Sequence, residues 1–294
     1  LYVTLEPCCT WGRTPPCTDL ILSSGVSRVV ACVRDPNPRH SGRGLTLLRR
    51  KGLAVLEGVC ADEGMKLIAP FSKWVRKRLP YVTLKLGISV DGKIADAQGS
   101  SRWITGPQAR ARVQELRRRV DAVLVGGRTV RIDNPTLLPR PSRGRKPWRI
   151  VLARHGLIPR ASKLLSDGDV GQTLIAVSNQ CPAKTLARLM ESGALVVKLP
   201  EQNGHVALTP LLRSLARSGI LHVLCEGGSE IAASMIRAHE VDEYLFFVSP
   251  CVLGGTESKS AVGGAGFLLC RNPLLEFESG EKVGRDLMIR AVPA

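Results

Sequence analysis

Two cysteines near the start of the chain, Cys8 and Cys17, have the side chains and the spacing of a metal-binding pair. They lie nine positions apart in Glu6–Cys17 (EPCCTWGRTPPC), and Pro15 and Pro16 favour a helix start at the second cysteine. Thiolates at this spacing suit a soft divalent ion such as zinc. A pair of cysteines alone is weak evidence for a metal site, so the flanking residues and a third ligand decide the interpretation.

A second group of residues, around Glu226, could bind a phosphorylated ligand. Glu226 follows a short apolar run and precedes Gly227 and Gly228. If that run is a strand of an open α/β sheet, the carboxylate at its end points into the crevice where such sheets bind ligands. The glycines let the backbone approach a ligand closely, and a helix from about Ser229 would offer N–H groups to the phosphates of a dinucleotide.

Charged side chains elsewhere could complete such a site. Arg117 and Arg140 are candidates for binding a phosphate group, because a guanidinium donates paired hydrogen bonds to phosphate oxygens. Arg117 precedes two further arginines on an expected helix, so a solvated helix face is the alternative.

Several stretches in a fixed order carry a resemblance to a known family. They are Glu6–Cys17, Asp35–Pro38 (DPNP), Gly42–Gly44 (GRG), Tyr81–Lys93 (YVTLKLGISVDGK), Ser101–Gly106 (SRWITG), Val125–Pro135 (VGGRTVRIDNP) and Cys225–Ser229 (CEGGS). Each stretch alone could be an ordinary turn or strand end. Together they resemble the bifunctional riboflavin-biosynthesis deaminase/reductase family, continuously from Tyr81 to the end of the chain.

The resemblance implies an NADPH-dependent reductase that transfers a hydride to C1 of the ribosylamino group of a phosphorylated pyrimidine. It implies cofactor contacts at Gly87, Trp103, Thr129, Asp133, Gly228, Ser229, Glu230, Ile231, Ala232, Ala233 and Ser234. It implies substrate contacts at Ser101, Arg117, Leu137, Arg140 and Glu226. For the implied reaction, the polar groups near that carbon that could move a proton are Lys85, Asp133 and Glu226, and the sequence leaves open which of them is the donor. It also implies a homo-oligomer.

The same resemblance places zinc on Cys8 and Cys17, but departures from the family pattern leave that site incomplete. Zinc deaminases of nucleobases take a third ligand from an upstream H-x-E segment, whose glutamate moves protons. Only seven residues precede Cys8, and Thr10 stands where the family has a histidine. The first domain is therefore expected to be chemically inert as written. The alternative is a bifunctional deaminase/reductase whose full gene product has an H-x-E segment upstream.

The candidate site residues lie on or between segments that alternate between strand and helix patterns. This alternation predicts two α/β domains with mostly parallel strands. Residues 1–78 are expected to form a truncated cytidine-deaminase-like layer, and residues 79–294 resemble dihydrofolate reductase in their sheet. The expected strands are Leu1–Leu5, Val26–Val33, Leu53–Val59, Tyr81–Ile88, Ala122–Gly126, Ile150–Ala153, Leu174–Val177, Leu195–Leu199, His222–Cys225 and Tyr244–Val248. The expected helices are Gly44–Lys51, Ala61–Arg78 with a break near Pro70, Pro107–Arg119 capped by Thr105, and Glu230–Ala238. Lys73–Leu79 is the candidate linker, and Pro139–Pro147 is predicted to be a basic loop.

The composition of the chain narrows the classes of molecule that it could bind and the compartment in which it could occur. Lys and Arg number 42 against 25 acidic residues, and the net charge of +17 fits either an ordinary soluble enzyme from an arginine-rich proteome or a protein with an anionic partner. Aromatic residues make up only 4%, which is few for stacking on single-stranded nucleic acid, so a phosphorylated small molecule is preferred and a nucleic-acid-binding module is the rival. No apolar run of about 20 residues predicts a membrane span, and no leader is recognised. The nine cysteines show no disulfide framework, which favours a reducing cytoplasm.

Overall fold

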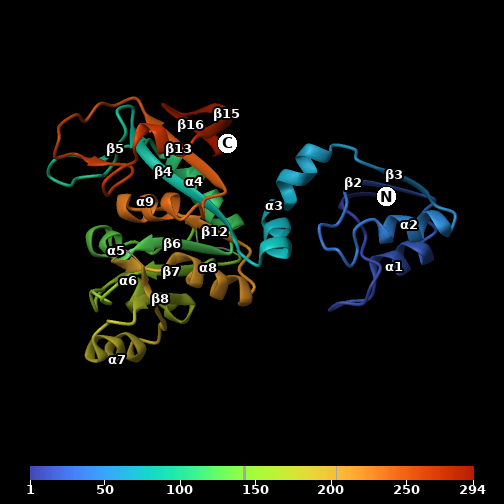
Figure 1. Cartoon of the computed structure of the whole chain (residues 1–294), viewed down its shortest axis with the longest axis horizontal. Coiled ribbons are helices and arrows are strands. Elements are labelled where there is room, and N and C mark those ends of the chain that lie inside the picture. The colour runs from blue at the N-terminus through green and yellow to red at the C-terminus, as the bar shows by residue number, and fades with distance from the viewer. Residues whose placement is uncertain (142–143, 203) are drawn as a thin grey trace. The chain divides into compact units, whose positions relative to one another are not determined.

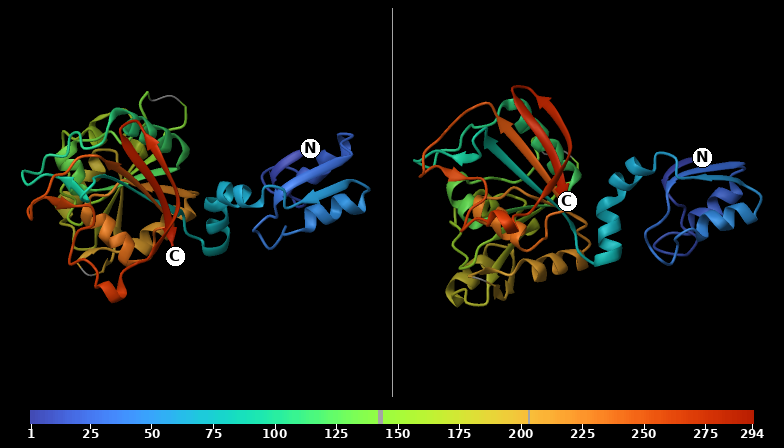
Figure 2. Two further views of the ribbon diagram at one scale, coloured as in Figure 1. Left: turned by 90° about the horizontal axis from the view of Figure 1, so that it is seen from above. Right: turned by 45° about the horizontal axis from the view of Figure 1, so that its top comes forward.

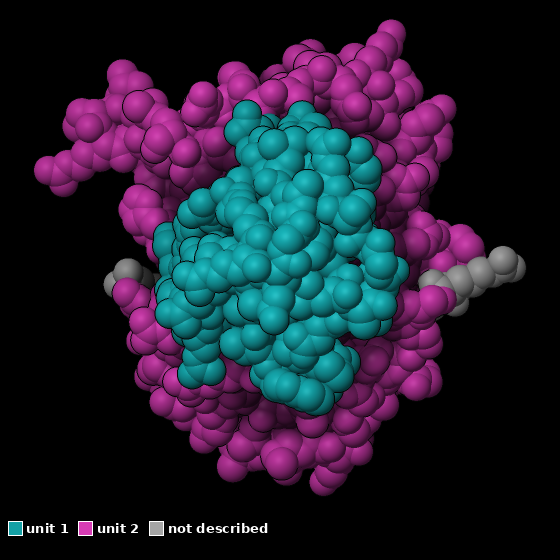
Figure 3. All heavy atoms as spheres, turned by 90° about the vertical axis from the view of Figure 1, so that its right-hand side faces the viewer, with its two compact units in different colours: residues 1–79 teal, residues 80–294 magenta. Residues whose placement is uncertain are grey.

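The computed structural model describes residues 1–141, 144–202 and 204–294. The chain divides into two compact units, Leu1–Leu79 and Pro80–Ala294, which Figure 3 distinguishes by colour. In the part of the chain that the structure describes, no helix has both the length and the apolar composition that crossing a membrane requires.

Unit 1 is a small parallel sheet with helices packed on it. Its strands pair in parallel in the order β1 (Tyr2–Leu5), β2 (Arg28–Val33), β3 (Ala54–Glu57). Its helices are α1 (Cys17–Ser23), α2 (Arg43–Arg50) and α3 (Ala61–Lys77). Ile21 of α1 and Leu48 of α2 are buried together with Val29 of β2. A Cβ on Gly64 would lie 2.8 Å from the Cβ of Cys32, so glycine is what lets α3 lie close to β2.

The helix α3 corrects two expectations from the sequence. It is continuous through Pro70, where a break was predicted. A proline costs the helix one backbone hydrogen bond, but Ile68 and Ser72 on either side are buried, so tertiary packing outweighs that loss. The candidate linker Lys73–Leu79 is also helical as far as Lys77, and α3 ends at Arg78, whose φ of 55° is left-handed.

Unit 2 is built on one large sheet (Figure 1). Within the described residues this sheet has nine strands, in the order β15-β16-β13-β4-β12-β6-β7-β8-β9. The strands are β4 (Tyr81–Ser89), β6 (Ala122–Gly126), β7 (Trp148–Leu152), β8 (Thr173–Ser178), β9 (Leu195–Leu199), β12 (His222–Cys225), β13 (Glu243–Ser249), β15 (Leu275–Val283) and β16 (Asp286–Pro293). From β13 to β9 every neighbouring pair is parallel, which confirms the predicted α/β class with a mostly parallel sheet.

Helices cover both faces of this sheet. They are α4 (Pro107–Arg119), α5 (Gly127–Asp133), α6 (Lys163–Ser166), α7 (Ala183–Glu191), α8 (Leu208–Arg217) and α9 (Ser229–Arg237). The connection from β4 to β6 passes β12 in one direction, and that from β12 to β13 passes β4 in the other. Because such crossovers are right-handed, α4 and α9 lie on opposite faces. Val113 of α4 accordingly packs with Phe247 of β13, whereas Ile231 of α9 contacts Gly126.

Short elements complete the unit. They are the paired strands β5 (Lys93–Ala95) and β14 (Lys259–Ser260), the pair β10 (Glu201–Gln202) and β11 (His205–Val206), and two 3₁₀ turns at Val170–Gln172 and Leu269–Arg271. The antiparallel hairpin of β15 and β16, red in Figure 2, was not expected from the sequence. Ser142 and Arg143 of the predicted loop Pro139–Pro147 lie outside the described residues.

The helix α4 has the predicted bounds but not the predicted cap. Gly106 is its N-cap residue, and no side chain caps it. Pro107 occupies the first helical position, where it removes one of the N–H groups that a cap would satisfy. Thr105 instead accepts a hydrogen bond at its carbonyl oxygen from Nη1 of Arg110, at 2.6 Å.

Candidate active site

The candidate site lies at the carboxyl edge of the sheet in unit 2, where β4, β12 and β6 end side by side. Backbone pairing continues past the end of β12. The N–H of Glu226 donates to Leu124 at 2.9 Å, and the N–H of Gly126 donates to Gly227 at 3.1 Å. Cys225 pairs with Leu84, so the next residues along, Glu226 and Lys85, lie opposite one another. Opposed residues share a face, and here it is the face that α4 covers.

Glu226 is held by Arg117 of α4. Nε and Nη2 of Arg117 donate to the two carboxylate oxygens at 2.6 and 2.8 Å, and Nη1 donates to the carbonyl of Leu138 at 3.2 Å. Both side chains are largely buried, with 13% of Arg117 and 11% of Glu226 exposed. Burial works to raise the pKa of Glu226, but the charges of Arg117 and Lys85 outweigh it and hold that pKa below its usual range. Glu226 is therefore a carboxylate with a fixed orientation.

The ion pair with Glu226 gives Arg117 a different role from the one expected from the sequence. The sequence suggested a phosphate clamp or a solvated helix face, whereas the structure gives the guanidinium a buried carboxylate partner. A two-point bond of this kind fixes the plane of both groups. Arg117 thus orients Glu226, and its contact with a substrate phosphate stays a prediction.

Lys85 is the second charged group of the site. Burial lowers the pKa of its ammonium group, a trend that Glu226 opposes and Arg117 reinforces. Its Nζ lies 6.0 Å from the centre of the Phe247 ring. A Cβ built on Gly87 would lie 3.6 Å from this Nζ, so the glycine leaves room beside the amine. A partly buried amine whose pKa is lowered gives up its proton more readily than an exposed lysine, which suits it to proton transfer.

Asp133, the third candidate for moving a proton, lies at the end of α5. Burial raises the pKa of its carboxyl group, and Arg102 opposes that rise from 3.8 Å. Its side chain is 34% exposed. Among the interactions of the described residues, none joins Asp133 to Lys85 or Glu226. Of the three candidates for moving a proton, the structure therefore brings Lys85 and Glu226 together, whereas Asp133 interacts with Arg102 instead.

The start of α9 forms a cradle beside this pair. Gly228 is the N-cap residue, and its N–H donates to Oγ1 of Thr129 at 3.4 Å. Gly227 has a φ of 80°, which favours glycine. A Cβ on Gly126 would lie 3.1 Å from the side chain of Ile231, so that glycine also serves close packing. The first N–H groups of a helix have no partner within it and carry positive dipole charge, so the cradle fits the phosphates of a dinucleotide.

Burial limits which atoms could make the cofactor contacts expected within α9, and those contacts stay a prediction. Ala232 and Ala233 are fully buried, so their side chains belong to the core and only their backbone could serve a ligand. Leu137 is likewise 1% exposed and packs in the core, which restricts a substrate contact to its backbone. Ser234 donates its hydroxyl to the carbonyl of Glu230 at 2.8 Å. The inward face of the helix is thus structural.

The remaining predicted contacts lie in loops around the edge. Trp103 is 64% exposed, and the guanidinium of Arg110 lies 4.4 Å from the centre of its ring. The carbonyl of Ser101 accepts a hydrogen bond from the N–H of Ile104 at 3.1 Å. Arg140 is exposed, and its backbone N–H donates to Gln114 at 3.0 Å. The sequence analysis missed Arg110, for which the only sequence signal is the basic face of α4.

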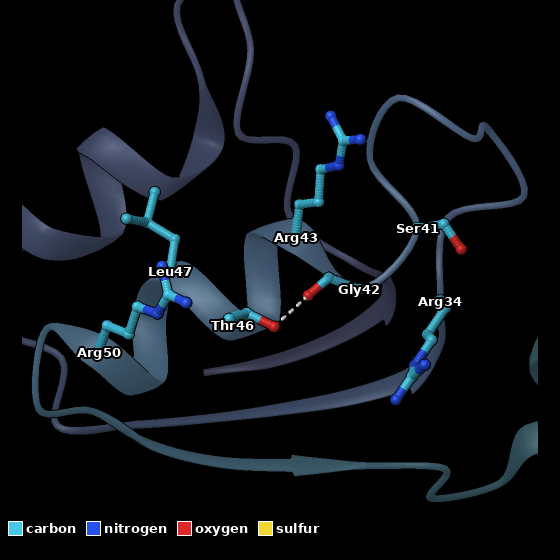
Figure 4. A pocket seen from close by; sticks show the side chains of 7 residues that line it. All are labelled: Arg34, Ser41, Gly42, Arg43, Thr46, Leu47 and Arg50. Atoms are coloured by element: carbon cyan, nitrogen blue, oxygen red, sulfur yellow. Dashed lines mark hydrogen bonds between the residues drawn. The ribbon is translucent and has the colours of Figure 1, made fainter.

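Unit 1 has a shallow pocket of about 410 Å³ of its own. It is lined by Arg34, Ser41, Gly42, Arg43, Thr46, Leu47 and Arg50. Figure 4 shows that Arg34 and Arg43 extend away from one another. Glu57 holds Arg34 through two hydrogen bonds, at 2.8 and 3.0 Å. The arginines therefore do not converge on one anion, and this pocket is not taken as the functional site.

Cys8 and Cys17 of unit 1 are close together, but they meet no third metal ligand among the described residues. The N–H of Cys17 donates to Sγ of Cys8 at 3.3 Å. His40, the nearest histidine, lies 3.9 Å from Sγ of Cys9 and 3.4 Å from Oγ1 of Thr10. In residues 1–141, 144–202 and 204–294 no three His, Cys, Asp or Glu side chains gather as a metal would need. A zinc ion does not fit the donor set that these residues present.

Comparison with known proteins follows the same division of the chain. Residues 80–289 match the family model described as the RibD C-terminal domain. The riboflavin biosynthesis protein RibD of Bacillus amyloliquefaciens is 37% identical over all of this chain and 79% of its own length. That of Escherichia coli is 34% identical over all of this chain and 82% of its own length.

Solved structures agree with the sequence comparison. A crystal form of Acinetobacter baumannii RibD superposes with a TM-score of 0.84 at 30% identity, over 99% of this chain and 79% of that one. A diaminohydroxyphosphoribosylaminopyrimidine deaminase/5-amino-6-(5-phosphoribosylamino)uracil reductase from Thermotoga maritima gives a TM-score of 0.82 at 32% identity, with the same coverage.

Proposed function

The chain belongs to the RibD family, and from that premise we propose that it catalyses the reductase step of riboflavin biosynthesis. The substrate is 5-amino-6-(5-phosphoribosylamino)uracil, and the product is its ribitylamino form. The observation that carries the proposal is the arrangement of Lys85 and the Arg117–Glu226 pair beside the glycine cradle of α9. One charged pair and one amine of lowered pKa thus adjoin a site with the chemistry to bind a dinucleotide.

The cofactor is NADPH, which supplies a hydride when it is bound. Gly228 and the first turn of α9 would hold its phosphates, and Thr129 and Trp103 would contribute further contacts. These assignments rest on the family resemblance together with the N–H groups and glycines of the cradle. Asp133 and Gly87 complete the proposed cofactor contacts.

The protein supplies orientation and a proton. When hydride reaches C1 of the open imine form of the ribosylamine, the nitrogen must take a proton. Lys85 is the donor, because Arg117 keeps Glu226 ionised and burial brings the pKa of Lys85 down. Glu226 accepts hydrogen bonds from the ribosyl hydroxyls, in the orientation that Arg117 sets. Ser101 and Arg140 bind the remainder of the substrate. The phosphate group of the substrate is compatible with the net positive charge of the chain.

The reductase assignment has a direct test. Purified chain should oxidise NADPH when given the deaminated ribosylamino-pyrimidine phosphate, and NADH should be a poorer donor. The loss of nicotinamide absorbance measures the rate, and the same mixture without the pyrimidine is the control. An absence of substrate-dependent oxidation by folded protein would contradict the proposal.

Unit 1 is assigned as a cytidine-deaminase-like layer, and unit 2 as a dihydrofolate-reductase-like domain. The rival reading is a bifunctional deaminase/reductase, and an upstream H-x-E segment in the gene would favour it. We further assign a cytoplasmic location and a homo-oligomeric state, with the phosphorylated pyrimidine rather than nucleic acid as partner.

Zinc content separates the two readings of unit 1. The present chain should hold well under one zinc per molecule and release no ammonia from the aminopyrimidine that a deaminase would use. The reason is that Cys8 and Cys17 meet no third ligand among the described residues. Metal analysis and an ammonia assay make the measurement. One zinc per chain accompanied by deamination would show that another residue, such as Cys9, completes the site.

A further inference from the structure

Residues 253–264, which follow β13, form a strap at the carboxyl edge of the sheet in unit 2. One end is fastened to Asp91, in the turn after β4. The N–H groups of Leu253 and Gly254 donate to the two carboxylate oxygens of Asp91 at 3.1 and 2.7 Å. A hydrogen bond from Ser89, together with these two, lowers the pKa of Asp91 to about 2. The fastening is therefore charged at any ordinary pH.

The middle of the strap is paired with a second segment, residues 93–106. Its strand β14 lies antiparallel to β5, and the N–H of Ala261 donates to Gly92 at 3.0 Å. In Figure 1 the orange strap can be followed beside the segment labelled β5. The segment that starts at β5 carries Ser101 and Trp103, two of the residues assigned to substrate and cofactor. The strap therefore supports one wall of the proposed site.

The far end of the strap lies on the first turn of α9. The N–H of Gly263 donates to the carbonyl of Ser229 at 3.0 Å, and that of Gly264 donates to Oε1 of Glu230 at 3.2 Å. A Cβ on Gly263 would lie 2.5 Å from the same Oε1 and 3.1 Å from Oγ of Ser229, so a side chain at this position would displace the Glu230 carboxylate from the strap. The side chain of Glu230 is thus engaged by the strap, which leaves its backbone for the cofactor.

We propose that this strap retains the nicotinamide dinucleotide and that Asp91 and Glu230, which fasten its two ends, are positioning residues for cofactor binding. The inference rests on the proposed function. The strap joins the two segments that bear the cofactor contacts, residues 93–106 and the start of α9, and neither carboxylate needs to touch the ligand. Releasing either end lets these segments separate and raises the dissociation rate of the cofactor.

The first test compares Asp91→Ala with a matched carboxylate at the opposite edge of the sheet. Asp121 also accepts two backbone N–H groups, those of Leu221 and His222, at 2.7 and 3.0 Å. Asp91→Ala should speed amide hydrogen exchange at Gly254 and weaken NADPH binding by about ten-fold, the usual scale for losing bonds to a charged acceptor. Turnover at saturating NADPH should stay within about two-fold, since Asp91 does not touch the reacting atoms. Asp91→Asn should restore part of the affinity, and Asp121→Asn should leave it unchanged.

The second test addresses the far end with Gly263→Ala. Gly171→Ala is the control, because nothing lies within 4 Å of a Cβ built there. Gly263→Ala should weaken NADPH binding and speed exchange at Gly264, and the control should do neither. Faster exchange with unchanged NADPH affinity in either strap variant would overturn the inference, as would unchanged exchange. A parent chain that binds no NADPH would overturn the proposed function and the inference together, whereas normal binding by the parent and by both strap variants would overturn the inference alone.

Discussion

Replacing Lys85 with methionine should lower kcat by about 10²- to 10⁴-fold, the range that a positioned proton donor contributes. Methionine has a similar length and is tolerated where an amine is partly buried, so the fold should remain. The affinity for NADPH should change little, because the cofactor phosphates are assigned to the start of α9. Single-turnover rates and a fluorescence titration with NADPH measure the two quantities separately.

The pH dependence of the parent enzyme checks the same assignment. In the proposed mechanism the protonated form of Lys85 is the donor, and this form is present below the pKa of the amine. Because burial lowers that pKa from the usual value of 10.5, the rate should fall as the pH rises through a point below 10.5, and the variant should lose this limb. Lys198→Met, on the exposed side of β9, is the control and should behave as the parent. A variant with near-normal kcat would remove Lys85 from the chemistry.

Replacing Glu226 with glutamine should lower kcat/KM for the pyrimidine by ten-fold or more, about 1.4 kcal/mol of transition-state stabilisation. The shapes match, but glutamine accepts from only one of the two Arg117 donors that hold the carboxylate. The affinity for NADPH should barely change. The melting temperature should also fall, because a largely buried guanidinium loses its counter-charge, and breaking buried pairs costs roughly 3–5 kcal/mol at most.

A second buried acid on the same sheet separates catalysis from stability. Glu243 pairs with Arg290 at 2.8 Å and is also 11% exposed, but it lies at the start of β13, near the amino end of β4. Glu243→Gln should lower the melting temperature while the folded enzyme keeps normal kcat/KM. If Glu226→Gln gave the same pattern, namely a destabilised but kinetically normal enzyme, Glu226 would have no place in the active site.

The parallel sheet was predictable because its strands are continuous apolar runs that end in glycines or acids. Ala122–Gly126 and His222–Cys225 have the predicted bounds. The hairpin after Gly284 was missed, although Asp286–Pro293 has alternating burial, because β15 is exposed along nearly its whole length and lacks an apolar face. The break at Pro70 was wrongly predicted because local propensity cannot register the burial of the residues around it.

The candidate site was predictable only in part, because sequence spacing cannot reveal partners. Glu226 was identified from its place before two glycines, but its bond to Arg117 joins residues 109 positions apart. The strap on Ser229 and Glu230 also depends on contacts between distant segments. The role of Asp91 was hidden because an Asp-Gly pair after a strand ordinarily indicates only a turn.

The place of β12 in the sheet has a consequence for how the protein folds. This strand comes late in the chain, yet it lies between β4 and β6, and its contact from His222 to Thr83 spans 139 positions. In a nascent chain that lacks β12, no strand can pair with both β4 and β6. The central part of the sheet can therefore form only after β12 has been synthesised. Folds dominated by such distant pairings are slow to form. Glu226, which we propose orients the substrate, follows this closing strand directly, so an incompletely synthesised chain would not have assembled the proposed site even in part.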